Sequence, residues 1–352
     1  MTSPRAHAAL ASAVVAVVAV AALVPLPLEG AAAAEASPPV VDLHVDLSYR
    51  VSYRGGSLAR GLGQYPASEL VRAGVAGVVL PLFVPHDVSP TGPRLADLEG
   101  SRTRLLALLP TVPPYSLPGC EAKGGTVKTW FSFEGAAPLA GDRAAARTWV
   151  ARGVRVFGFV HTHDNALATS SSGGEKTYGL SPLGRDLLHD VDAAGGVVDV
   201  SHASDATVAD VLAEAAKDGA PVIATHSDAR ALVSNPRNLT DEQIRGIART
   251  GGVVGVNFHS RFLVARGRAT LADVVKHVLH LVRVAGAEHV AIGSDFEGDI
   301  DPPVGMESVA GFPRLFAALR RAGLSRDDAA RVFGENALRL LCPPAAAPTR
   351  KP

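Results

Sequence analysis

Eight short apolar runs, separated by stretches of helical spacing or by loops, organise most of this chain. They are VVDLHVD (40–46), AGVVLPLF (76–83), TWFSFEG (129–135), VRVFGFVH (154–161), GVVDVSH (196–202), PVIATHS (221–227), GVVGVNF (252–258) and VAIGSDF (290–296). Strand-like runs that alternate with helices predict a parallel sheet covered by helices. Eight such units within about 300 residues favour a closed (β/α)8 barrel of the TIM type over an open sheet.

The first 36 residues have the layout of a signal peptide. Arg5 and His7 precede an apolar run from Ala9 to Val24, and prolines and small residues follow it. The run is shorter than the roughly 20 residues that a membrane-spanning helix needs. We therefore expect cleavage near Ala34 or Ala36 and export of the mature chain to the periplasm, the cell envelope or the medium. An uncleaved N-terminal anchor is the alternative.

The remaining sequence predicts a single domain over residues 37–345 and a disordered tail over residues 346–352. No second apolar segment of spanning length follows the signal, so we expect no transmembrane span in the mature chain. The 34 basic and 34 acidic residues give a formal net charge of zero. A chain with zero net charge has no overall positive potential that would attract nucleic acid. The only two cysteines, Cys120 and Cys342, either pair in an oxidising compartment or remain free thiols.

Histidines and carboxylates gather where the predicted strands end. The candidates are His44, Asp46, Glu134, His161, His163, His202, His226 and Asp295. Active sites of (β/α)8 barrels lie at the C-terminal ends of the strands, so these side chains should converge. His44 and Asp46 project from the same face of one strand, because side chains alternate along it. Imidazoles and carboxylates without cysteine favour a catalytic zinc or another first-row metal over a structural zinc site.

Other polar positions and two segments are interpreted as surroundings of the site. His277 and His280 lie three residues apart on a predicted amphipathic helix, and we expect them at the surface or rim. Tyr49–Pro66 and Thr169–Gly174 are predicted to be loops that overhang the site. His259 follows the seventh strand run, and the sequence assigns no role to it or to His163.

Motifs in these segments resemble the membrane dipeptidase family, also called the renal dipeptidase or M19 peptidase family. They are VDLHVD, FSFEGA, VDVSHAS, ATHSDAR, PRNLTDEQI, VVGVNF, IGSDFEG and FGENALRLL, in the family order. The resemblance implies a (β/α)8 barrel of the metal-dependent hydrolase type that holds two zinc ions, and it implies a homodimer. It places His44 and Asp46 on one metal and His202 and His226 on the other, with Glu134 bridging both.

The resemblance further assigns His161, Arg237 and Asp295 to substrate binding and catalysis. His161 is preferred to His163 because its spacing to Asn165 matches the family. Two metals that share a water lower its pKa toward 7 and so supply a hydroxide nucleophile. His161 would then bind the developing oxyanion, and Asp295 would carry a proton from the water to the leaving amine. Arg237 offers a forked, permanently charged partner for a substrate carboxylate.

The sequence therefore predicts a zinc-dependent dipeptidase that cleaves dipeptides, including those with a C-terminal D-residue, by a metal-bridging hydroxide. A related binuclear-metal amidohydrolase that acts on another amide, a lactone or an N-acyl amino acid is the alternative. Arg237 favours dipeptides, because their carboxylate lies one residue beyond the scissile bond. A third hypothesis is a non-catalytic exported binding protein, and the intact set of candidate ligands argues against it.

Overall fold

The computed structural model describes Met1 and residues 35–89, 92–121, 125–174 and 178–343. The compact unit begins at Ala36. The predicted signal peptide from residue 2 to residue 34 and the predicted tail lie outside the described residues. Within the described part of the chain, no helix is both long enough and apolar enough to cross a membrane.

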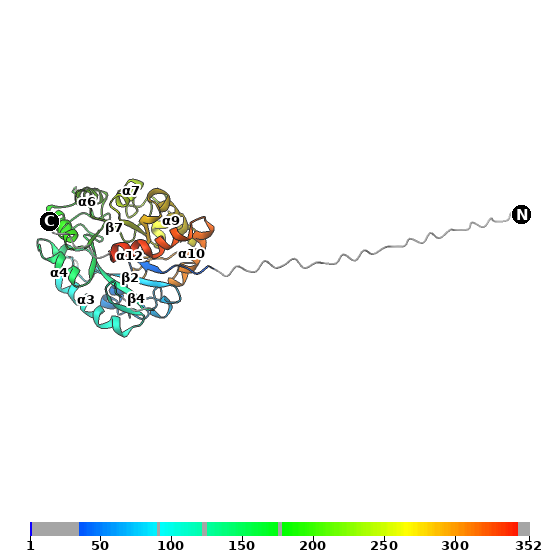
Figure 1. Cartoon of the computed structure of the whole chain (residues 1–352), viewed down its shortest axis with the longest axis horizontal. Coiled ribbons are helices and arrows are strands. Elements are labelled where there is room, and N and C mark those ends of the chain that lie inside the picture. Colours follow the sequence, from blue (N-terminus) through cyan, green and yellow to red (C-terminus); the bar gives the residue numbers. More distant parts are fainter. Residues whose placement is uncertain (2–34, 90–91, 122–124, 175–177, 344–352) are drawn as a thin grey trace, which may run out of the picture. The chain divides into compact units, whose positions relative to one another are not determined.

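Eight parallel strands close into a barrel (Figure 1). They are β1 (Val40–Asp42), β2 (Val75–Leu82), β4 (Val127–Glu134), β5 (Val154–Gly158), β6 (Val197–Asp199), β7 (Val222–Ala224), β8 (Val253–Val256) and β9 (Val290–Ile292). Each strand pairs with the next in this order, and β9 returns to β1 with Ile292 opposite Asp42. Each strand arises from one of the eight apolar runs, so the predicted (β/α)8 barrel is confirmed.

A further strand, β3 (Tyr115–Pro118), is added to the barrel and was not predicted from the sequence. It pairs in parallel with the beginning of β4, with Tyr115 opposite Val127. It is only four residues long and partly exposed, and it ends in a proline. A segment of this kind lacks the continuous apolar run that marks a buried strand.

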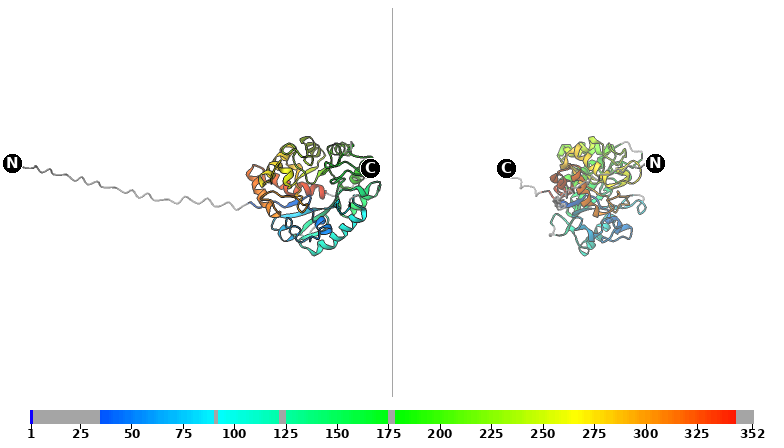
Figure 2. Two further views of the ribbon diagram at one scale, coloured as in Figure 1. Left: turned by 180° about the vertical axis from the view of Figure 1, so that it is seen from behind. Right: turned by 90° about the vertical axis from the view of Figure 1, so that its right-hand side faces the viewer.

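Helices and helical turns surround the barrel, as the two views in Figure 2 show. The α-helices are α1 (Leu47–Tyr53), α2 (Ala67–Leu70), α3 (Leu95–Leu108), α4 (Ala145–Ala151), α5 (Pro182–Ala193), α6 (Asp205–Asp218), α7 (Asp241–Arg249), α8 (Ser260–Leu263), α9 (Leu271–Ala285), α10 (Phe312–Arg321), α11 (Arg326–Ala330) and α12 (Asn336–Leu341). The predicted loop Tyr49–Pro66 is wrong in part, because α1 extends through Tyr53. The loop Thr169–Gly174 contains no helix or strand.

The surface placement expected for His277 and His280 is wrong, because both side chains are buried on the inner face of α9. Nε2 of His277 lies 3.2 Å from the carbonyl oxygen of Leu263, and Nε2 of His280 lies 2.7 Å from Asp241 Oδ1. Partners on neighbouring loops and helices compensate for removing these rings from water.

A layer of alternating side chains fills the inside of the barrel, and α12 covers the N-terminal end of the strands. Val41, Val79 and Ile223 from three strands pack in one cluster with Leu340 and Leu341 of α12. In Figure 1 this helix lies near the centre of the ring of strands. The opposite, C-terminal end of the barrel is therefore left for the site.

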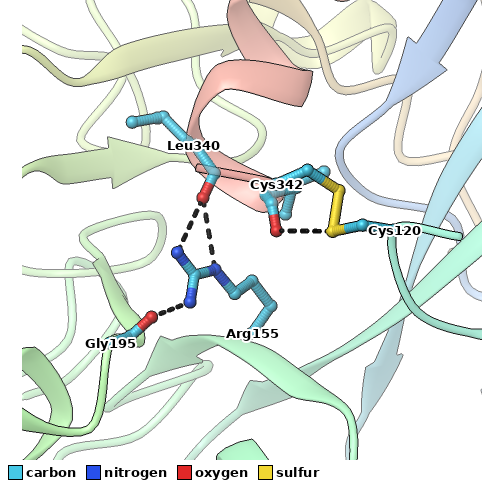
Figure 3. Close-up of a disulfide and its surroundings, with 6 residues drawn as sticks. Cys120, Arg155, Gly195, Leu340 and Cys342 are labelled. Atoms are coloured by element: carbon cyan, nitrogen blue, oxygen red, sulfur yellow. Dashed lines mark hydrogen bonds between the residues drawn. A yellow bond between two sulfur atoms is a disulfide. The ribbon is translucent and has the colours of Figure 1, made fainter. Parts of the chain in front are cut away.

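The disulfide Cys120–Cys342 joins the end of α12 to the residue two positions after β3 (Figure 3). The guanidinium group of Arg155, at the beginning of β5, donates to the carbonyl oxygen of Leu340 at 3.2 and 3.1 Å and also to that of Gly195. The two cysteines, whose pairing the sequence leaves open, thus fasten the last helix to the barrel.

Candidate metal centre

The predicted ligands all meet at the C-terminal end of the barrel. Glu134 is the last residue of β4, and the others follow their strands by two to four residues. The carboxylate oxygen Oε1 of Glu134 is the centre of the cluster. Nε2 of His202 lies 3.0 Å from it, and Nε2 of both His44 and His226 lies 3.7 Å from it. Nε2 of His44 also lies 3.5 Å from Asp46 Oδ2.

The donor atoms form overlapping triads. His44, Asp46 and Glu134 make one, Glu134, His202 and His226 another, and the potential ligand atoms within each lie within 4.8 Å of one another. Glu134 belongs to both, so its carboxylate can contribute to two neighbouring sets of ligand atoms. A third triad combines His44, His226 and Asp295.

Several buried polar atoms of the cluster fit a metal better than they fit a hydrogen-bond network. Among the described residues, both ring nitrogens of His44, Oδ1 of Asp46 and Nδ1 of His202 have no hydrogen-bond partner. Leaving such buried groups unpaired costs about 1–3 kcal/mol each. Imidazole nitrogen and carboxylate oxygen are ligands that zinc accepts in catalytic sites. The residues present therefore fit a bound first-row metal.

A hydrogen-bond chain fixes the ring of His226. The hydroxyl of Thr225 donates to Asp199 Oδ2 at 2.5 Å and lies 2.8 Å from Nδ1 of His226. Because that hydroxyl proton is used by Asp199, Nδ1 of His226 must donate, which leaves a lone pair on Nε2. Such outer contacts set the tautomer of metal-binding histidines.

The pKa values of the histidines in the cluster shift in opposite directions. Burial opposes protonation of His44, but the carboxylates of Glu134 and Asp46 raise its pKa to about 10. Burial, with the positive charge of Arg237 and neighbouring histidines, holds the pKa of His202 and His226 well below the usual value. The carboxylates of Glu134 and Asp46, which favour a proton on His44, would attract a metal cation at the same place.

Asp295 has a strained backbone conformation, and Asn257 holds its side chain beside the cluster. Its φ of 63° lies in the left-handed region, and its Oδ2 accepts from Asn257 Nδ2 at 3.0 Å. Burial, reinforced by the charge of Asp46, raises the pKa of Asp295 well above the usual range. A Cβ at Gly298 would lie 2.6 Å from oxygens of both Asp295 and Asp46, so only glycine permits this approach.

A cavity of about 280 Å³ opens above the cluster. Arg237 lines it, is 8% exposed, and has its guanidinium carbon 5.5 Å from the ring centroid of Phe262. The lining also includes residues to which the sequence assigned no role, namely Tyr49, Phe83, His259, Phe262, Asp299 and Ile300. They lie in loops or in the short helices α1 and α8 and form no metal-ligand pattern, so no sequence signal identifies them.

The two neighbouring histidines after β5 take different positions. His161 lines the cavity, with Nε2 3.9 Å from Glu134 Oε1 and its ring packed edge-on against Phe83. Burial lowers its pKa. His163 is exposed and lies with its ring against His86, 4.5 Å between centroids.

Fold and ligand set together define a (β/α)8-barrel protein of the metal-dependent hydrolase class. Residues 29–347 match the membrane dipeptidase family, peptidase family M19, and the chain belongs to this family.

Individual relatives agree with the family match. An uncharacterized dipeptidase of Schizosaccharomyces pombe is 34% identical over 217 residues, which are 61% of this chain and 52% of the relative. The chain thus spans about half the length of that curated relative. The crystal structure of an M19 metallopeptidase described as dipeptidase AC has a TM-score of 0.76 at 26% identity, covering 87% of this chain and 98% of the other. A metallopeptidase from Rhodobacter sphaeroides, solved with a phosphinate mimic of the dipeptide L-Ala-D-Ala, has a TM-score of 0.76 at 25% identity, covering 87% and 99%.

Proposed function

We propose that this protein is a zinc-dependent dipeptidase with two zinc ions at the barrel mouth. The observation that carries the proposal is the position of Glu134, shared between one triad with His44 and Asp46 and another with His202 and His226. Family membership and the M19 structures with similar folds support a peptide-bond hydrolase. When bound, two zinc ions would polarise the scissile carbonyl and lower the pKa of a shared water.

The other residues of the cavity can orient a dipeptide and move its proton. Nε2 of His161 lies on the cavity side of Glu134, where it can donate to the oxygen of the scissile carbonyl as charge develops there. Asp295 has Oδ2 engaged by Asn257, so Oδ1 is the atom we assign to receive the proton and pass it to the leaving amine.

Arg237 would select substrates that end in a carboxylate close to the scissile bond. Its guanidinium group is buried beside Phe262 and lines the same cavity as Glu134 and His161. A buried cation with a forked set of donors gains most from a bidentate carboxylate partner. The cavity of about 280 Å³ has room for a short peptide.

We also propose that a D-residue at the C-terminal position is accepted. The support is the R. sphaeroides metallopeptidase with its mimic of L-Ala-D-Ala. The signal-like N-terminus supports export of the mature chain, and the family resemblance supports a homodimer.

Hydrolysis of a substrate panel by the zinc-loaded protein tests the proposed function. The panel contains L-Ala-L-Ala, L-Ala-D-Ala, N-acetyl-L-alanine and a lactone. We expect cleavage of both dipeptides and none of the lactone. Cleavage of N-acetyl-alanine or the lactone at rates above those of the dipeptides would favour the amidohydrolase alternative. Light scattering coupled to size exclusion would show whether the chain is the proposed dimer.

A further inference from the structure

A second cavity, of about 510 Å³, lies beside the metal centre and shares Glu134 and His161 with the first one. Its other walls come from the loops that follow β2, β4 and β5. Arg237 lines the first cavity but not the second. Glu134 and His161 therefore lie between two cavities, and only the first cavity is lined by Arg237, the proposed partner of the substrate carboxylate.

Two histidines outside the metal cluster form one wall of this second cavity. The rings of His86 and His163 are stacked, with centroids 4.5 Å apart and planes inclined by 23°. The hydroxyl of Thr162 lies 2.9 Å from Nδ1 of His163 and fixes the orientation of that ring. Both rings are exposed, so they present a flat aromatic surface to anything that enters the cavity.

The rest of the lining combines aliphatic surface with polar and negatively charged side chains, so it disfavours an acidic guest. Val84, Pro93, Ala137 and Ala166 contribute aliphatic surface. Asp164 also lines the cavity, and its Oδ1 accepts from the backbone N–H of Ser170 at 2.7 Å. Its negative charge would repel a carboxylate, while aromatic rings favour stacked or edge-on contacts with other rings.

We propose that this second cavity receives the side chain of the N-terminal residue of the substrate and prefers a large aromatic side chain, which packs against His163 and His86. The inference rests on the proposed dipeptidase function. With the C-terminal carboxylate at Arg237 and the scissile carbonyl at His161, the N-terminal residue lies on the side of Glu134 away from the arginine. His86 and His163 are thus specificity residues that do not take part in the chemical step.

Dipeptide pairs with reversed order test this assignment. The values of kcat/KM for Phe-Ala, Ala-Phe and Ala-Ala are compared in the unmodified protein and in His163→Ala and His86→Ala. We expect Phe-Ala to be cleaved better than Ala-Ala, and each variant to lose about five- to tenfold on Phe-Ala only. His189→Ala, which removes a histidine that lines neither cavity, should leave all three values within about twofold.

A filling variant gives a second, independent readout. Ala166 is exposed at the rim of the cavity, so Ala166→Phe should fold while occupying the space. It should reduce kcat/KM for Phe-Ala by about tenfold or more and leave Gly-Ala unchanged. Equal losses on both substrates, or no loss on Phe-Ala, would overturn the assignment.

Calorimetric binding of Phe-Ala and Ala-Ala separates this inference from the proposed function. If no dipeptide is hydrolysed but His163→Ala still weakens binding of Phe-Ala alone, the dipeptidase function is wrong and the aromatic subsite stands. If the unmodified protein binds both dipeptides equally, the subsite is wrong whatever the turnover.

Discussion

The hydroxyl oxygen of Thr225 lies 2.8 Å from Nδ1 of His226 and donates its own proton to Asp199. This contact determines which nitrogen of His226 faces Glu134, where Nε2 lies 3.7 Å from Oε1. Thr225 and Asp199 are thus positioning residues for His226, which we propose as a metal ligand, although neither would touch a metal itself.

Replacing Thr225 by valine should therefore weaken the metal centre without removing a ligand. Valine keeps the shape of threonine, but it leaves Nδ1 of His226 without an acceptor. We expect zinc affinity to fall about 10- to 100-fold, the usual effect of losing such an outer contact. Competition with a zinc-binding dye measures the zinc affinity of each variant. Thr225→Ser, which retains the hydroxyl, is the matched control, and an equal loss in both variants would contradict the assigned role.

Arg237→Ala should damage binding of carboxylate-bearing substrates selectively. We expect KM for L-Ala-D-Ala to rise on the order of 100-fold, because a buried charge-assisted pair is lost, with a smaller change in kcat. The corresponding dipeptide amide lacks the carboxylate and should respond weakly. Arg185→Ala removes a surface arginine that pairs with Asp210 and serves as the control. Equal effects on the dipeptide and its amide would exclude Arg237 as the carboxylate partner.

Removing the disulfide should lower stability and leave the site intact. Cys120 and Cys342 are 222 residues apart in sequence, and a cross-link over such a separation stabilises by about 5 kcal/mol in the loop-entropy estimate. The variant Cys120→Ser/Cys342→Ser should unfold at a lower urea concentration. It should keep kcat at 25 °C, because α12 covers the end of the barrel opposite to the metal cluster. Reduction of the disulfide in the unmodified protein should lower the urea midpoint in the same way. An unchanged midpoint in both the variant and the reduced protein would contradict a stabilising role of the disulfide.

His277 should make the protein acid-sensitive. Burial lowers its pKa from 6.5 to about 4, and the N–H of Ala229 donates to its Nδ1, which requires the neutral ring. Between pH 6.5 and pH 4, His277 is protonated in the unfolded chain but stays neutral in the folded chain. The stability contributed by His277 is thus complete above pH 6.5 and is lost progressively down to pH 4, by about 3 kcal/mol in total.

Urea unfolding between pH 4 and pH 7 measures this loss. The variant His277→Gln cannot titrate, so its free energy of unfolding should change less over this range than that of the unmodified protein. Equal slopes in the two proteins would show that another group is responsible for the acid sensitivity.

The barrel and the convergence of the ligands were predictable because strand ends in a (β/α)8 barrel share one location. His202 and His226 follow separate apolar runs, and the alternation of helix and strand alone brings them together. Gly298 was not predictable, since its role depends on the carboxylate of Asp46, which comes from a distant segment and would clash with a Cβ at this position. The burial of His277 was missed for a similar reason, because its partners Ala229 and Leu263 are visible only in three dimensions.

The central claim is that two zinc ions, shared through Glu134, make this chain a dipeptidase. The most direct measurement is the hydrolysis of L-Ala-D-Ala by metal-free protein as zinc is added in known equivalents. We predict that activity is absent without metal, rises with zinc and levels off at two equivalents per chain, while Glu134→Gln stays inactive throughout. Full activity in the metal-free protein, or a plateau at one equivalent, would contradict the two-zinc account.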